Sequence, residues 1–194
     1  MNLEGTETLK NLARAFAGES QARNRYDFYA NQLRREGQEY LYRVISEISH
    51  NEHAHAKIFW NYLVQSGQNG FPNIDFDAGY PYVAGDSIVN LTNAAHGEEQ
   101  EATNIYPKFA EIARGENFPQ IATSFEQISK IEASHNQMFT QMKVELQNGS
   151  LYKKANPITW KCENCGYEFS GSEVPPQCPV CQHPTGFFNT PIGK

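Results

Sequence analysis

Apolar residues recur every three or four positions along most of the first 147 residues, and this spacing predicts amphipathic helices. Four segments carry the pattern, which predicts helices over about residues 6–35, 38–65, 87–114 and 119–146. The long connection between the second and third segments contains four glycines and two prolines, so it is not helical throughout. Two helical hairpins joined by one long crossover is the connectivity of a ferritin-like fold. We therefore predict a mainly α, ferritin-like four-helix bundle over residues 1–147.

Acidic side chains interrupt each apolar stripe near its middle. A glutamate lies there on every helix, a histidine follows it on the second and fourth helices, and a further glutamate follows it on the third. The set comprises Glu19, Glu52, His55, Glu98, Glu101, Glu132 and His135. A glutamate on a helix usually belongs to a solvated face, but these residues alternate with leucine, isoleucine and phenylalanine. We therefore expect all seven to face the bundle interior at a similar depth.

Such a cluster needs cations, because burying one unpaired carboxylate costs several kcal/mol. The pattern places a single basic residue, Arg23, on a stripe. Two divalent ions would bring four positive charges to the five carboxylates of the set. Glutamates combined with two Glu-x-x-His motifs form the ligand set of di-iron and di-manganese carboxylate proteins. One such motif is weak evidence, but two of them on apolar stripes, with matching glutamates on the other helices, indicate a two-metal site.

Two further residues of the helical region bear on this site. Tyr26 lies two turns beyond Glu19 on the same stripe and is placed either to hydrogen-bond a ligand carboxylate or to serve as a plain core tyrosine. Pro107 lies inside the third predicted helix, where a proline kinks the helix or leaves a carbonyl without its partner.

The chain changes character after residue 147. We predict a linker over residues 148–157 and a small metal domain over residues 158–194, which contains every cysteine of the chain. Cys162 and Cys165 form one C-x-x-C pair, and Cys178 and Cys181 form another, with twelve residues between the pairs. This arrangement predicts a tetrahedral four-sulfur metal site, and the spacing leaves iron and zinc both open. A domain this short needs its metal to fold.

Composition narrows the possible surroundings and partners. The formal net charge is −6 and the chain has no dense run of lysine and arginine, so nucleic acid binding has little electrostatic support. No stretch is long and apolar enough to span a membrane, and the first residues do not resemble a signal peptide. Paired C-x-x-C motifs without an export signal favour bound metal over disulfides, so we expect a reducing cytoplasm.

Several motifs, taken together and in order, resemble the rubrerythrin family. They are the run AFAGESQARNRY at 15–26, Glu52-x-x-His55-Ala56-Lys57, Glu98-x-x-Glu101 with Tyr106-Pro107, Glu132-x-x-His135, and the C-terminal C-x-x-C-G-Y and C-P-x-C. The resemblance spans nearly the whole chain. One departure is Gln182, which stands where a glycine usually follows the second cysteine pair in free rubredoxins.

The resemblance implies a non-haem diiron peroxidase that reduces hydrogen peroxide to water and protects against oxidative stress. It implies two iron ions in the bundle, held by the seven residues named above, and one iron ion in a rubredoxin-like four-cysteine centre, where zinc is possible in isolated protein. It also implies that His55 and Glu101 exchange as ligands with redox state, and that Tyr26 and Tyr106 support the ligands. Electrons would come from rubredoxin or a flavin-dependent NAD(P)H reductase.

Geometry suggests at least a homodimer. His135 lies eleven residues before Leu146, or about 16 Å along a helix, so a domain beyond that end begins far from its own two-metal site. Two rival functions stay open at this stage. The chain could be a ferroxidase or iron-handling protein, or a metal-binding protein that uses a zinc ribbon to contact partners.

Overall fold

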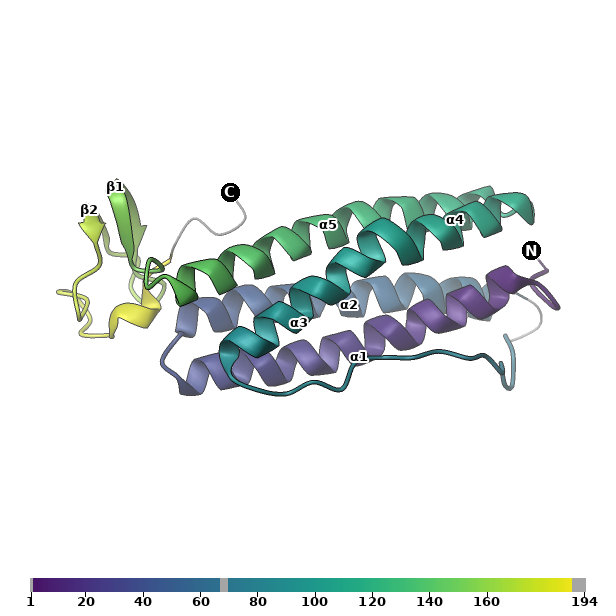
Figure 1. Cartoon of the computed structure of the whole chain (residues 1–194), viewed down its shortest axis with the longest axis horizontal. Helices are drawn as coiled ribbons and strands as arrows, with labels where there is room; N and C mark the ends of the chain where they lie inside the picture. The colour runs from purple at the N-terminus through teal and green to yellow at the C-terminus, as the bar shows by residue number, and fades with distance from the viewer. Residues whose placement is uncertain (1, 67–69, 190–194) are drawn as a thin grey trace.

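The computed structural model describes residues 2–66 and 70–189, and it is dominated by long helices (Figure 1). The helices are α1 (Glu7–Arg35), α2 (Glu39–Gln65), α3 (Ser87–Gln100), α4 (Tyr106–Gly115) and α5 (Pro119–Gln147). A short π-helical turn, Glu101–Ile105, joins α3 to α4, so these two elements run on as one interrupted helix. The prediction of a mainly α, ferritin-like four-helix bundle is confirmed.

Local sequence signals explain where the helices begin and end. The Thr6 side chain accepts a hydrogen bond from the backbone N–H of Leu9 at the start of α1, and Asp86 caps α3 in the same way. Pro119 lies in the first turn of α5, where its missing N–H costs nothing. Gly37 follows the end of α1 with φ +82°, a left-handed conformation that a glycine adopts without strain.

The bundle consists of two hairpins, α1 with α2 and the interrupted α3–α4 helix with α5, and the crossover joins them. Its described part, residues 70–85, runs in extended form along α1 (Figure 1). Two tyrosine hydroxyls hydrogen-bond the crossover to α1. The Tyr80 hydroxyl donates to the Arg14 carbonyl at 2.8 Å, and the Tyr29 hydroxyl donates to the Val83 carbonyl at 2.6 Å. Residues 67–69 of the predicted connection lie outside the described residues.

The helix predicted over 87–114 is interrupted in its middle, next to the proline that was expected to disturb it. Pro107 has no N–H to donate, and the preceding N–H, that of Tyr106, bonds to the Glu101 carbonyl five residues back. This wider turn inserts one extra residue and rotates the following helix. Its interior face therefore carries Tyr106, Ala110 and Ala113, all buried. Ile105, Phe109 and Ile112, which continue the three-to-four-residue spacing of Glu98 and Glu101, are only partly buried.

A second correction concerns the basic residue near the cluster. Arg23 is exposed and contacts His53 on the outer surface, whereas Arg25 is the buried arginine of α1, with 8% of its surface exposed. Apart from these shifts, the expected stripes hold. The apolar interior forms one cluster on each side of the acidic residues, represented by Ile45 and Phe139 on one side and by Phe59 and Phe125 on the other.

The C-terminal region forms a small separate core. Strands β1 (Lys153–Lys161) and β2 (Glu168–Glu173) pair antiparallel, and a 3₁₀ turn follows at Thr185–Phe187. Trp160 is fully buried at its centre and donates its indole N–H to the Gly171 carbonyl at 2.8 Å. Strand β1 begins inside the stretch expected as a linker. The exact domain bounds remain a prediction, and residues 190–194 of the expected domain lie outside the described residues.

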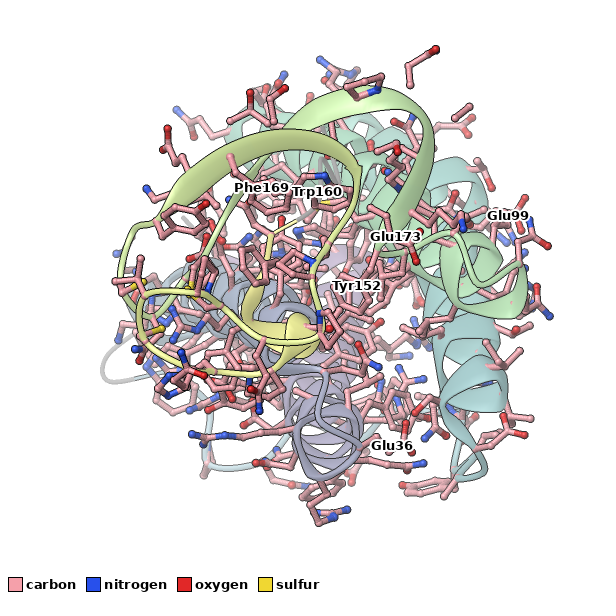
Figure 2. The ribbon with its side chains drawn as sticks, turned by 90° about the vertical axis from the view of Figure 1, so that its left-hand side faces the viewer. Glu36, Glu99, Tyr152, Trp160, Phe169 and Glu173 are labelled. Atoms are coloured by element: carbon pink, nitrogen blue, oxygen red, sulfur yellow. The ribbon has the colours of Figure 1, made fainter. Side chains whose placement is uncertain are left out.

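This small domain is attached to the end of the bundle where α1 turns into α2. The Tyr152 hydroxyl donates to the Gln38 side chain at 2.6 Å, and Arg43 donates to the Glu163 carbonyl at 3.2 Å. Figure 2 looks along the bundle from this end and labels Tyr152, which packs against the cores of both the bundle and the small domain. Gly186 lies directly against the carbonyl of Gly37.

Among the described residues, none of the helices combines the length and the apolar character that crossing a bilayer requires.

We predict that Gly186→Ala weakens the packing of the small domain against the end of the bundle. A Cβ atom at this position would overlap the Gly37 carbonyl oxygen, and forcing an extra methyl group into a packed contact costs about 1–3 kcal/mol. The expected result is faster amide hydrogen exchange in the α1–α2 turn. Gly115→Ala, at the other end of the bundle where an added Cβ meets nothing within 4 Å, is the control. Equal exchange in both variants would contradict the prediction.

Candidate metal centres

Six of the seven predicted residues converge in the middle of the bundle. They form two groups of four, in each of which one potential ligand atom per residue lies within 4.8 Å of the others. One group is Glu19, Glu52, His55 and Glu132, and the other is Glu52, Glu98, Glu132 and His135. Glu52 and Glu132 belong to both groups. Because two carboxylates are shared, the arrangement suits a pair of adjacent cations bridged by carboxylate groups.

The carboxylates are buried, and several of their oxygens lack hydrogen-bond partners in the described structure. Glu19, Glu98 and Glu132 have no exposed surface, and Glu52 has 1%. Both oxygens of Glu132 and one oxygen each of Glu19, Glu52 and Glu98 are buried without a hydrogen-bond partner among the described residues. Orphaned buried oxygens are costly. Bound cations satisfy them, so the residues present fit the metal ions that the ligand pattern predicts.

The two histidines face the carboxylates through the same ring nitrogen. His55 Nδ1 lies 2.9 Å from one oxygen of Glu132, and His135 Nδ1 lies 2.8 Å from the other. These two Glu132 oxygens nevertheless have no partner with hydrogen-bond geometry. Nitrogen and oxygen atoms that are close without pointing at each other are arranged as ligands that face a common ion.

Without metal, the imidazoles supply the positive charge of the cluster. Burial lowers the pKa of His135, but the carboxylates of Glu132, Glu52 and Glu98 lie close to the ring, outweigh burial and raise the pKa to about 12. Burial also lowers the pKa of His55, but the surrounding carboxylates outweigh burial, so the pKa of His55 is raised. Both rings are therefore protonated in the metal-free chain at neutral pH. Metal ions that bind here displace these protons, because only the neutral ring is a ligand.

The carboxyl groups respond unequally. Burial raises the pKa of Glu19 well above its usual value, and burial followed by the charge of Glu52 raises the pKa of Glu98 to about 8. Burial would also raise the pKa of Glu52, but hydrogen bonds to His135 and His55 outweigh it and lower the pKa to about 2. The metal-free cluster therefore contains a mixture of protonated and ionised carboxyl groups.

Two fully buried tyrosines hold one oxygen each of two carboxylates. The Tyr26 hydroxyl donates to Glu98 Oε1, and the Tyr106 hydroxyl donates to Glu19 Oε1. The other oxygens of Glu98 and Glu19 are the ones left without a partner. Each tyrosine therefore fixes one side of a carboxylate and leaves its other side available to a cation.

Glu101 is the predicted residue that lies outside both groups. It begins the π turn, is only partly buried, and places Oε1 3.8 Å from the point where Gly18 would carry a Cβ atom. Burial, then the charges of Glu98 and Glu132, raises its pKa. Its carboxylate thus stands beside the cluster and not in it.

Sequence reasoning missed two residues next to the site. The side-chain amide of Asn51 lies 3.3 Å from His135 Nε2, the nitrogen that does not face the carboxylates, and this contact orients the ring. Arg25 donates to Asn93 Oδ1 at 2.7 Å. No spacing rule could identify Asn51, because it lies off the apolar stripe. Arg25 immediately precedes Tyr26, so a slightly wider buried face on α1 would have included it.

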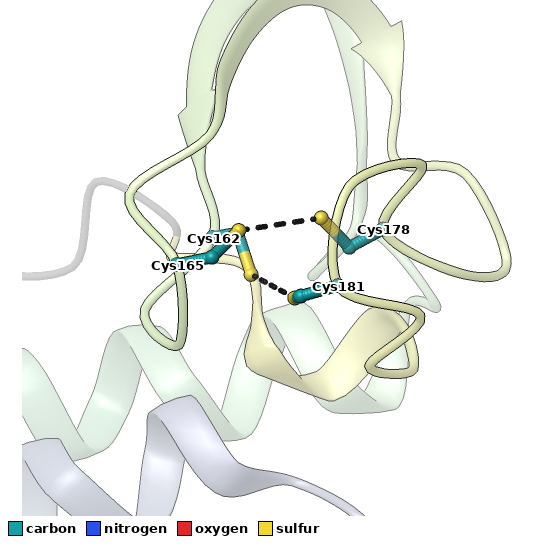
Figure 3. A group of neighbouring side chains, drawn as sticks. All are labelled: Cys162, Cys165, Cys178 and Cys181. Atoms are coloured by element: carbon teal, nitrogen blue, oxygen red, sulfur yellow. Dashed lines mark hydrogen bonds between the residues drawn. The ribbon is translucent and has the colours of Figure 1, made fainter.

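The four cysteines form a second centre at the end of the molecule (Figure 3). The Cys162 and Cys181 sulfurs are 3.7 Å apart, and the Cys165 and Cys178 sulfurs are 3.6 Å apart. These separations are far too long for disulfides, whose sulfurs lie about 2.05 Å apart. A tetrahedron with metal–sulfur bonds of about 2.3 Å has edges of roughly 3.8 Å. The sulfurs are therefore spaced to hold one tetrahedral metal ion.

The two knuckles have matching backbones but different residues at one key position. The N–H of Gly166 donates to the Cys162 carbonyl, and the N–H of Gln182 donates to the Cys178 carbonyl in the same way. Both residues adopt the left-handed backbone conformation, with φ +77° for Gly166 and +62° for Gln182. Gln182 therefore holds a conformation that usually favours glycine. In the same knuckle, the backbone N–H of His183 stabilises the Cys181 thiolate and lowers its pKa to about 6.

Comparison with known protein families gives two matches that divide the chain as its two cores do. Residues 10–143 match the family model described as Rubrerythrin, and residues 160–189 match the one described as Rubrerythrin, rubredoxin-like domain.

Named relatives align along nearly the whole chain. A rubrerythrin of Clostridium perfringens is 38% identical over 96% of this chain and 95% of its own length. A rubrerythrin of Porphyromonas gingivalis is 39% identical over 96% of this chain and 91% of its own length.

Solved structures share the fold at lower identity. The fully reduced state of nigerythrin covers 97% of this chain and 91% of its own, with a TM-score of 0.62 and 23% identity. A bacterioferritin of Mycobacterium tuberculosis covers 77% of this chain and 91% of its own, with a TM-score of 0.65 and 18% identity. The predicted cofactors are confirmed: the bundle carries a diiron carboxylate site, and the four-cysteine site takes one iron or zinc ion.

We predict that removing metal from the four-cysteine site exposes Trp160. A core this small depends on its metal, so the now fully buried indole should meet water and its fluorescence should shift to the red. The measurement uses a Trp60→Phe background, because Trp60 is the other tryptophan and is already 43% exposed. Unchanged Trp160 emission after complete chelation would mean that the domain holds its fold without metal.

Proposed function

This chain belongs to the rubrerythrin family, a diiron family linked to oxidative stress, and we propose that it reduces hydrogen peroxide to water at its diiron site. Electrons enter through the four-cysteine centre. The observation that carries the proposal is the buried pair of four-ligand groups that share Glu52 and Glu132, in the same chain as a tetrahedral sulfur site. When two ferrous ions are bound by these residues, they would supply the two electrons that the reduction of one peroxide molecule requires.

The proposed ligand roles follow the two groups. Glu19 and His55 would hold one ion, Glu98 and His135 would hold the other, and Glu52 and Glu132, which belong to both groups, would serve both ions. The cysteines at 162, 165, 178 and 181 hold the third ion. Four carboxylates balance two divalent cations, so the arrangement described here matches the charge of the reduced site.

Glu101 has a separate role in the proposal. Oxidation of the ions would add positive charge to the site, and a fifth carboxylate beside the cluster can compensate this charge. We propose that Glu101 would take the place of His55 as a ligand when the bound ions are oxidised. Its place at the start of the π turn supports this role, because π turns recur at functional sites and give the backbone a place to adjust.

The chain's own groups prepare the site for peroxide. Tyr26 and Tyr106 hold Glu98 and Glu19 by one oxygen and keep the other turned toward the metals. The two apolar clusters on either side exclude water from the ligands, which strengthens each electrostatic contact inside the site.

The electron route involves a second chain. His135 lies eleven residues before Leu146, about 16 Å along α5. The small domain that contains the four cysteines lies beyond that end of the bundle (Figure 1). A homodimer in which each sulfur centre approaches the diiron site of its partner shortens this path. We propose rubredoxin or a flavin-dependent NAD(P)H reductase as the external donor, in the cytoplasm.

Peroxide turnover tests the proposed function. Iron-loaded protein with an NAD(P)H-linked flavin reductase and rubredoxin should consume hydrogen peroxide steadily, without net loss of ferrous iron to a mineral. Formation of a ferric mineral core with oxygen, and no steady peroxide turnover, would instead identify the rival ferroxidase function.

Glu132→Ala tests the shared ligands. Glu132 belongs to both bundle groups, so its loss should remove both bundle ions and leave only the ion of the four-cysteine site, with peroxide turnover abolished. Metal analysis and activity are measured together. Glu126→Ala is the control, because Glu126 lies on the same helix but forms an exposed ion pair with Arg114, and such pairs contribute little. Full iron content in Glu132→Ala protein would refute the assigned bridge.

A further inference from the structure

A cleft of about 530 Å³ lies beneath the crossover and leads toward the diiron site. Its walls come from α1, from residues 78–81 of the crossover, and from the interrupted α3–α4 helix. Glu101 and Tyr106 are among its lining residues, so the cleft reaches two residues that stand at the diiron cluster.

Tyr80 lines the cleft from the crossover and comes near Glu101 beside Gly18. Its hydroxyl is fixed to the Arg14 carbonyl at 2.8 Å. Its Cε1 atom lies 3.6 Å from the point where Gly18 would carry a Cβ atom, and Glu101 Oε1 lies 3.8 Å from that same point. Because Gly18 has no side chain, the tyrosine ring and the carboxylate approach one spot. A molecule in the cleft therefore meets Glu101 and the Tyr80 ring together.

The cleft is larger and more apolar than hydrogen peroxide requires. A water molecule occupies about 30 Å³ of liquid. Hydrogen peroxide has one more oxygen atom and is only modestly larger. Clefts of about 300–1,000 Å³ with mostly apolar walls are typical sites for organic ligands. Here Ala15, Pro81, Ile105 and Phe109 contribute apolar surface. Space and lining both suit a substrate with an organic substituent.

We propose that this cleft binds organic hydroperoxides with an apolar substituent, and that the chain reduces them in addition to hydrogen peroxide. The proposal rests on the proposed function, which supplies the electrons. Breaking the O–O bond takes two electrons, which the diiron site would supply when it is loaded with ferrous ions, and two protons, which come from solvent. The hydroperoxide ROOH thus becomes the alcohol ROH and one water. Tyr80 acts as the residue that limits substituent size.

The first test narrows the cleft. Anaerobically reduced, iron-loaded protein is mixed with hydrogen peroxide or cumene hydroperoxide, and the return of the oxidised four-cysteine absorption is followed in one turnover. Asn104 is exposed and lines the cleft. We expect Asn104→Trp to slow the reaction with cumene hydroperoxide by about tenfold or more, a typical scale of steric discrimination in a pocket, and to leave the hydrogen peroxide rate unchanged.

Thr103→Trp is the matched control for this variant. Thr103 is the preceding residue, is also exposed, lies in the same π turn and does not line the cleft. It should react like the unmodified protein with both peroxides. Equal slowing by both tryptophan variants, or slowing of both peroxides by Asn104→Trp, would overturn the proposal.

The second test widens the cleft. Tyr80→Ala should raise the rate with cumene hydroperoxide relative to hydrogen peroxide. Tyr82→Ala removes a tyrosine of the same crossover that is 91% exposed and lies outside the cleft, so it should leave the ratio unchanged. An unchanged ratio in Tyr80→Ala protein would remove Tyr80 from this role.

A binding measurement gives a readout that does not depend on turnover. The product alcohol, 2-phenyl-2-propanol, should bind the oxidised holoprotein in calorimetry, and Asn104→Trp should abolish the heat of binding while Thr103→Trp retains it. If hydrogen peroxide oxidises the reduced protein but cumene hydroperoxide does not, this proposal alone fails. If neither peroxide oxidises it, the proposed function fails as well.

Discussion

The attraction between buried carboxylates and bound cations is the interaction on which this structure depends. Four glutamates with almost no exposed surface meet in the middle of the bundle, and several of their oxygens have no partner in the described part of the chain. Without ions, protonated imidazoles and neutral carboxyl groups must hold the cluster together. With ions, the same atoms become ligands, and the apolar clusters on both sides become a dry wall around them. The bundle is therefore built around a charge that it cannot itself balance well.

Much of the site could be predicted from sequence because helical spacing determines which side chains face inward. On α2 and α5 the expected stripes are the buried ones, and they carry Glu52, His55, Glu132 and His135 to the centre. The cysteine pairs were equally predictable, since two C-x-x-C knuckles bring four sulfurs into one tetrahedron whatever the surrounding loops do.

Other features depend on contacts that spacing cannot reveal. A proline predicts a disturbed helix, but whether the helix kinks or widens into a π turn depends on what the following residues pack against, and here Tyr106 reaches Glu19. Arg25 is buried in place of Arg23 because the crossover and α3 cover that side of α1, and this tertiary coverage is invisible along a single helix. The position of Glu101 beside the cluster likewise follows from the altered turn.

The π turn also has a consequence for how chains of this kind are compared and designed. The π turn adds one residue to the helix but no further helical turn. Every residue after Ile105 is therefore shifted by one position relative to the α-helical register that Glu98 sets. A sequence alignment against a chain with an uninterrupted helix should therefore open a single-residue gap within 101–105. A designed bundle that omits this extra residue would turn the tyrosine at position 106 away from the glutamate of the first helix.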